Sequence, residues 1–199
     1  MPSEWLEQVI ERIDQLNRED PNTELIGGIA HPRELLYAKR LTEWVLRLNP
    51  KASEALRIAA RGQHVQRWTI PRQRYKMNRR GYLRWRETLK AFHAKTLGEL
   101  MREVGYPEEL IQRVQQIMSK RRLQDDPDSQ TLEDALCLVF LETQFAGLRQ
   151  KTPDDKMKDI LQKTWKKMSG PGRAAAMRLP LGEDEKRLLA QALKEGHKD

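Results

Sequence analysis

The chain has 199 residues, 33% of them charged and 38% hydrophobic, so it is long enough for one well-packed domain and short for two. No apolar run approaches the roughly 20 residues that a membrane-spanning helix needs, and the acidic, amphipathic start is unlike a secretory signal. The net charge of +8 can mean a nucleic acid, a membrane surface or a small phosphorylated substrate as the partner.

Apolar residues recur at the helical period along nearly the whole chain, and no strand-like alternation persists, which predicts an all-α protein. Ser3 can cap a first helix that ends near residue 19. A second helix is expected over about 32–48, and Ser53 can cap a third over about 53–68. Residues 71–78 form a proline- and arginine-containing loop.

The second half continues the helical pattern. A fourth helix is expected over about 80–103, closed by Gly105, and a fifth over about 107–120. After a polar turn at 125–129, a sixth helix runs from about 132 to 150. Thr152 can cap a seventh that reaches 168, and a last helix follows Gly182. We expect a main helical domain over 1–151 and a short C-terminal helical extension, 152–199, packed on it.

Basic and aromatic side chains interleave between residues 67 and 86. The basic ones after Trp68 are Arg72, Arg74, Lys76, Arg79, Arg80, Arg84 and Arg86, and the other aromatic ones are Tyr75, Tyr82 and Trp85. Cations neutralise phosphates and rings offer stacking surfaces, so the mixture could bind a nucleotide or a single strand. Alternatively, the aromatic rings anchor a loop to the core while the arginines stay solvated.

Four polar side chains fall where helices should bury theirs: His31, His64, His93 and Asp134. His93, for example, lies four residues from both Leu89 and Leu97. A buried imidazole or carboxylate needs a partner, because burying it unpaired costs several kcal/mol or so. One explanation is a shared polar site around a metal ion. The other is four core residues that are hydrogen-bonded separately.

The order of these residues resembles the HD-domain superfamily of helical metal-dependent phosphohydrolases, whose ligand pattern is His, then His-Asp, then Asp. The matching segments are HPREL at 31–35, IAARGQH at 58–64 and LEDALCL at 132–138. The resemblance implies an HD-like helical bundle with His31, His64 and Asp134 as metal ligands and His93 as a further candidate. The stretch over 31–145 also looks like an uncharacterised HD-like family catalogued only as a domain of unknown function.

One departure concerns the aspartate that names the superfamily, because Val65 follows His64 here. Valine cannot coordinate a metal. A divalent ion (Mn, Fe, Zn or Mg) would therefore lack one usual anionic ligand, and a degenerate site would hold none.

The resemblance also directs attention to charged residues near these segments. Glu34 and Arg61 are the candidate catalytic residues, with Glu133 as another possible base or supporting carboxylate. The candidate phosphate-binding residues are Arg33, Lys39, Arg67, Arg72 and Arg79. Each of these charges could instead be a solvated surface group.

Two functions follow as expectations. The first is a metal-dependent phosphohydrolase acting on a nucleotide or another small phosphorylated compound. The alternative is a non-catalytic HD-like module that binds nucleotide or RNA through the basic–aromatic surface. The missing aspartate favours the alternative, whereas the retained polar residues favour the enzyme. A scaffold for another protein is a third possibility. The single cysteine, Cys137, allows no intrachain disulfide, so we expect a cytoplasmic protein without membrane partners.

Overall fold

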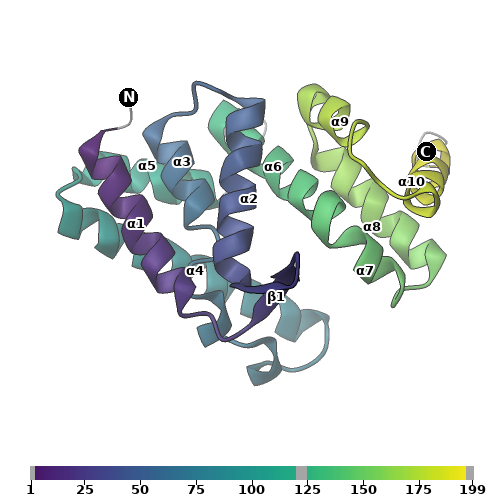
Figure 1. Cartoon of the computed structure of the whole chain (residues 1–199), viewed down its shortest axis with the longest axis horizontal. Helices are drawn as coiled ribbons and strands as arrows, with labels where there is room; N and C mark the ends of the chain where they lie inside the picture. The colour runs from purple at the N-terminus through teal and green to yellow at the C-terminus, as the bar shows by residue number, and fades with distance from the viewer. Residues whose placement is uncertain (1–2, 120–124, 196–199) are drawn as a thin grey trace. The chain divides into compact units, whose positions relative to one another are not determined.

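The computed structural model describes residues 3–119 and 125–195. Helices dominate it (Figure 1), which confirms the expected all-α class. Its contacts divide the chain into two compact units, Met1–Ser129 and Gln130–Asp199. None of the described helices is long and apolar enough to cross a membrane.

Five helices build the first unit. They are α1 (Glu4–Arg18), α2 (Arg33–Leu48), α3 (Glu54–Arg61), α4 (Arg79–Val104) and α5 (Glu108–Ser119). Helix α1 packs on α2, α3 and α4, and α5 packs on α3 and α4. The connection between α3 and α4 contains two short 3-10 turns, η1 (Arg67–Thr69) and η2 (Arg72–Arg74). This connection carries His64 and Arg67, two of the polar residues described below.

Local signals set several helix ends as predicted. The Ser3 Oγ atom accepts a hydrogen bond from Leu6 N at 3.1 Å, and Ser53 Oγ accepts one from Leu56 N at 3.1 Å. Helix α4 ends at Gly105, whose φ of +101° lies in the left-handed region that glycine adopts readily.

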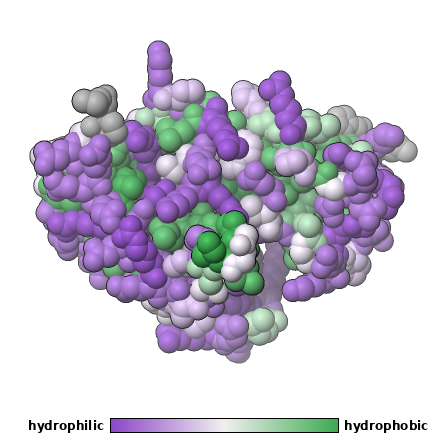
Figure 2. Space-filling model, in the orientation of Figure 1, coloured by the Kyte–Doolittle hydropathy of each residue, from purple (hydrophilic) through white to green (hydrophobic). Residues whose placement is uncertain are grey.

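A β-hairpin before α2 was not expected from the sequence. Strands β1 (Thr23–Ile26) and β2 (Ile29–Pro32) pair antiparallel around two glycines with positive φ. The side chains of Leu25 and Ile29 are 72% and 64% exposed, so the hairpin shows no alternation of buried and exposed residues. Figure 2 shows apolar atoms on the face that carries this hairpin. His31 therefore lies in β2 rather than at the head of a helix.

The third helix is shorter than the sequence predicts, because α3 ends at Arg61. Gly62 follows it, and a Cβ atom there would lie 2.3 Å from a methyl group of Leu97 on α4. Because Gly62 has no side chain, Leu97 of α4 can approach its Cα atom closely. Helix α3 ends just before this glycine. His64 accordingly lies in the turn after α3 and not on a helical stripe with Leu56.

The second unit contains most of α6 (Pro127–Thr143), which begins in the first unit, and four further helices. They are α7 (Phe145–Arg149), α8 (Asp154–Lys167), α9 (Gly170–Ala176) and α10 (Glu183–Glu195). Helices α8 and α10 pack together. The expected sixth helix begins earlier than predicted and is interrupted after Thr143. The boundary between the two units falls after Ser129, and the expected division into 1–151 and 152–199 stays a prediction. The predicted end of the fifth helix, at 120, lies outside the described residues.

Candidate functional site

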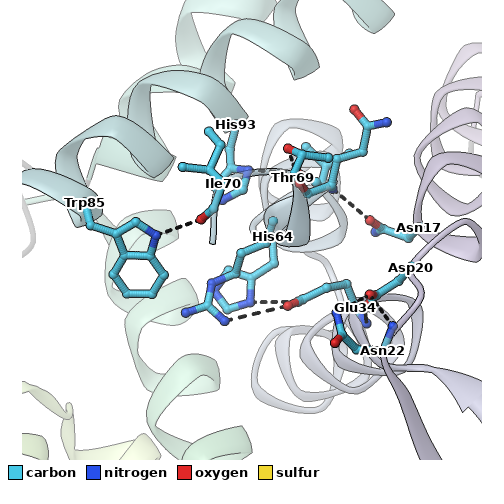
Figure 3. A network of polar contacts seen from close by, with 12 residues as sticks. Asn17, Asp20, Asn22, Glu34, His64, Thr69, Ile70, Trp85 and His93 are labelled. Atoms are coloured by element: carbon cyan, nitrogen blue, oxygen red, sulfur yellow. Dashed lines mark hydrogen bonds and ion pairs between the residues drawn. The ribbon is translucent and has the colours of Figure 1, made fainter. Parts of the chain in front are cut away.

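A hydrogen bond joins His64 to Glu34, in the first turn of α2 (Figure 3). The His64 Nδ1 and Glu34 Oε2 atoms are 3.2 Å apart. Burial alone would raise the pKa of Glu34, but the hydrogen bond from His64 and the nearby charge of Arg67 lower it. An ionised carboxylate can only accept, so the Nδ1 atom of His64 carries the proton.

The environment of His64 keeps its ring neutral. Burial lowers the pKa of His64, and the hydrogen bond to Glu34 opposes this only in part. The ring stacks on Tyr37 with centroids 4.1 Å apart and an interplanar angle of 11°. With Nδ1 protonated and the ring held between these partners, Nε2 keeps its lone pair.

A second imidazole, that of His93, lies close by in the middle of α4. Its side chain is buried, as its helical spacing predicts, and its Nδ1 atom donates to the Val65 carbonyl at 2.9 Å. Burial lowers the pKa of His93 to about 3, and repulsion from His64, once that ring is protonated, adds to this shift. Its Nε2 atom is buried with no hydrogen-bond partner within the described residues. The His64 and His93 ring centroids are 6.1 Å apart.

An unusual backbone conformation orients the residues that follow His64. Gln66 has φ +51° and ψ +31°, a left-handed conformation that costs a non-glycine residue about 1 kcal/mol or more. The side-chain oxygen of Asn17, at the end of α1, accepts from Gln66 N at 3.1 Å. Asn17 is fully buried, so α1 fixes this turn.

Arg67 comes next and lies against the same carboxylate. Its Nη1 atom is 3.6 Å from Glu34 Oε1, and its guanidinium group lies 5.0 Å from the centre of the Trp85 ring. The Trp85 Nε1 atom donates to the Ile70 carbonyl at 2.8 Å, which ties the connection to α4 (Figure 3). Glu34 therefore faces His64 with one oxygen and Arg67 with the other. We call His64, His93, Glu34 and Arg67 the polar cluster.

The remaining candidates from the first half of the chain lie outside the polar cluster's described contacts. Arg61 forms a two-pronged ion pair with Asp14, at 2.6 and 2.5 Å, in which both side chains are largely buried. Arg33 and Lys39 are exposed on α2, and His31 is half-buried in β2. The contacts of Arg61 favour a structural role.

Arg72 and Arg79 also differ from one another in their surroundings. Arg72 donates to the carbonyls of Tyr75, Lys76 and Asn78, so it holds the loop in shape. Arg79 is exposed at the first position of α4. The arginine charges that lower the pKa of His64 come from Arg67 and Arg86.

Asp134 belongs to the second unit and is buried there, as predicted. Its carboxylate accepts from Gln130 Nε2 at 3.0 Å, from Ser169 N at 2.8 Å, and from Ser169 Oγ. A Cβ atom at Gly172 would lie 2.6 Å from this carboxylate. These contacts give Asp134 a complete set of partners at the start of α9, and they account for its burial without a metal ion. Glu133 is buried beside it, 3.5 Å from Lys167 Nζ.

Sequence reasoning did not predict the roles of three residues that shape the site. Asn17 holds the turn at Gln66, Tyr37 stacks on His64, and Trp85 contacts Arg67 and Ile70. Asn17 could have been found, because it lies at helical spacing from Ile13 on the buried face of α1. No sequence signal identifies the stacking of Tyr37 on His64, which depends on where the turn after α3 places that ring.

The first unit is thus largely helical and contains a buried carboxylate–histidine pair, Glu34 and His64. Beside this pair lies the Nε2 atom of His93, which has no partner among the described residues. The chain belongs to the family described as Domain of unknown function (DUF4202), whose model matches residues 7–189. This confirms membership of an uncharacterised family, and the match provides no link to the HD-domain superfamily. No curated protein and no solved structure matches the chain.

Proposed function

We propose that the chain is a phosphohydrolase that acts on a nucleotide or another small phosphorylated compound, with the polar cluster as its centre. One observation carries the proposal: His93 Nε2 lies buried beside His64 and has no partner in the part of the chain that the structure describes. A buried acceptor left unpaired costs about 1–3 kcal/mol. Such a cost is typical of a group that receives its partner from a ligand.

The two imidazoles fit the nitrogen ligands of a divalent metal ion. Each donates Nδ1–H to an oxygen, of Glu34 for His64 and of Val65 for His93, and histidines that bind metals through Nε2 are commonly held in this way. Among the described residues, no three or more His, Cys, Asp or Glu side chains form a group that could hold a metal. Water or substrate would have to supply the other ligands. When bound, such an ion lowers the pKa of a bound water and polarises a phosphoryl oxygen.

The other members of the polar cluster suit a phosphorylated substrate. Arg67 Nη1 is 3.6 Å from Glu34, longer than a good hydrogen bond, so its N–H groups can turn to phosphate oxygens. Glu34 holds His64 in the tautomer whose Nε2 atom keeps its lone pair for the metal ion. The Tyr37 ring stacks on His64, and the Trp85 ring lies against the Arg67 guanidinium group.

The likeness to the HD-domain superfamily belongs to this proposal. The order His31, His64, Asp134 supports it, and Val65 in place of the usual aspartate argues against it. If the aspartate's loss has removed catalysis, the chain is a non-catalytic module that binds nucleotide or RNA. A cytoplasmic location likewise stays a proposal.

Untagged protein purified without chelator provides the test, by elemental analysis and by phosphate release from a panel of nucleotides. We expect bound transition metal and metal-dependent phosphate release. His64→Ala and His93→Ala should each lose both while keeping the helical circular dichroism signal. Arg67→Ala should raise KM more than it lowers kcat.

Two further variants separate the possible ligand sets. His31→Ala and Asp134→Asn should leave metal content unchanged if the pair His64 and His93 holds the ion. Loss of metal in both would support the full set implied by the HD likeness. Unchanged metal content and turnover in His64→Ala and His93→Ala would overturn the proposed centre, and absence of phosphate release from the parent protein would favour the non-catalytic module.

A further inference from the structure

A cavity of about 740 Å³ opens where the connection after η2 meets the start of α4. Its lining includes four cations, Arg74, Lys76, Arg80 and Arg84, together with Tyr75 and Thr88. Among the described residues, no aspartate or glutamate lines it, and its lining residues lie outside the polar cluster. The cavity is therefore a second, strongly cationic feature of the first unit.

Within the described residues, no ion pair neutralises the cations that line this cavity. From Arg72 to Arg86 the chain has seven arginines and lysines and no aspartate or glutamate, which nearly accounts for the net charge of +8. Along the described chain, the neighbouring ion pairs are those of Arg67 and Lys90, on either side of this segment. Nearly all of the protein's excess charge is thus concentrated beside one cavity.

This arrangement opposes helix stability. Arg79 and Arg80 occupy the first turn of α4, where the helix dipole favours acidic residues, and that turn contains none. Arg80 and Arg84 are four residues apart on one face, so their charges repel one another. Each effect costs a few tenths of a kcal/mol or so. An anion bound in the cavity would turn both of these destabilising effects into stabilising ones.

The walls of the cavity are held in place. Arg72 bonds three carbonyls of the loop, and a Cβ atom at Gly81 would lie 2.0 Å from the carbonyl oxygen of Lys76. The loop backbone therefore sits directly on α4, and this contact fixes the Lys76 backbone beside Arg80. Preorganised cations bind an anion at a smaller entropic cost than mobile ones.

Aromatic rings distinguish the ligand from a simple anion. Tyr75 lines the cavity, and Tyr82 on α4 is 42% exposed. We infer that the cavity binds a single nucleic-acid strand, with its phosphates on the four cations and its bases on the exposed rings. Four cations, none in an ion pair within the described residues, exceed what one phosphate group needs, which favours a strand over a mononucleotide. This inference does not depend on the proposed hydrolase activity.

Fluorescence anisotropy with a labelled short oligouridylate tests the inference over about 50 to 200 mM salt. The double variant Arg80→Ala with Arg84→Ala should bind about tenfold more weakly, and its salt slope should fall by about 1.4, or 0.7 for each lost phosphate contact. The matched control removes two exposed charges from the second unit, Lys166→Ala with Arg178→Ala, and should leave affinity and slope unchanged. The melting temperature of the double variant should stay the same or rise.

Competitors identify the ligand class. Unlabelled oligouridylate should displace the probe, whereas uridine monophosphate, polyphosphate and anionic vesicles at the same phosphate concentration should not. Equal displacement by the mononucleotide would mean a small-ligand site, and equal displacement by polyphosphate or vesicles would mean a generic anion surface; either result overturns the inference. Equal affinity of the double variant and the parent would overturn it as well.

Discussion

The Val65 carbonyl accepts the hydrogen bond that His93 donates through Nδ1, at 2.9 Å, while the Val65 side chain is fully buried. If the proposed likeness to the HD-domain superfamily holds, Val65 stands where that pattern has a metal-binding aspartate. Here that position contributes its backbone to the site and its side chain to the core.

The first prediction follows from this burial. Val65→Asp should lower the free energy of unfolding by about 3–5 kcal/mol, because it places an unpaired carboxylate in the core. It should not increase metal content. Val65→Thr, of similar shape, should cost about 1–3 kcal/mol for one unpaired hydroxyl. Urea unfolding measures both, and a stable Val65→Asp protein with added metal would contradict the prediction.

The second prediction concerns acid. Unfolded imidazoles titrate near pH 6.5, whereas the pKa of folded His93 is about 3. As the pH falls below about 6.5, the unfolded chain gains protons that the folded chain does not. The free energy of unfolding should then decrease by up to about 1.4 kcal/mol per pH unit for each such histidine.

His64, whose pKa is also lowered, adds to this slope. His93→Gln keeps an N–H donor for Val65 and removes one titrating group, so it should reduce the slope between about pH 6.5 and 5 by roughly half. Its stability at pH 7, measured first, separates the mutational cost from the pH effect. Equal slopes in the two proteins would show that His93 is protonated in the folded state.

The third prediction tests the role of Arg61. Arg61→Leu should cost about 3–5 kcal/mol, because it leaves the buried Asp14 carboxylate without its partner. Arg33→Leu, at an exposed position of α2, should change stability by no more than about 0.5 kcal/mol. A catalytic Arg61 would instead show lost turnover with little change in the unfolding midpoint.

The fourth prediction concerns the turn at Gln66. Gln66→Gly should relieve the left-handed conformation, worth about 1 kcal/mol, and lose part of that gain to the greater freedom of the unfolded chain. We expect unchanged or slightly increased stability, whereas Gln66→Val should lose more than about 1 kcal/mol. A destabilised glycine variant would mean that the Gln66 side chain, and not its backbone, matters here.

Residues that act locally were predictable. Ser3, Ser53 and Gly105 end or begin helices through contacts within a few residues, and the spacing of His93 is enough to place it in the core. His64 was predicted as part of a polar site but placed on the wrong element, because the end of α3 depends on the approach of α4 to Gly62.

Contacts between distant residues account for what the sequence did not reveal. Asp134 has the burial that its helical stripe predicts, yet its partner is Ser169, 35 positions away. The hairpin was not predicted because Leu25 and Ile29 are exposed, so its strands lack the alternation of buried and exposed residues that marks a half-buried strand. The partner of Asp134 is determined by the tertiary fold and not by the neighbouring sequence.

The β1–β2 hairpin also has a consequence for how this chain can vary. The residues at its two ends are already joined, since Arg33 N donates to the Asn22 carbonyl at 2.9 Å and Asp20 accepts from Glu34 N at 3.0 Å. These two bonds join the chain before the hairpin to the chain after it. They therefore fix the direction of α2, and with it the position of Glu34, without the hairpin itself. Lengthening, shortening or replacing the segment between residues 23 and 32 leaves those two bonds intact. This is the point in the first unit where evolution or an engineer can insert new sequence at the least cost to the polar cluster.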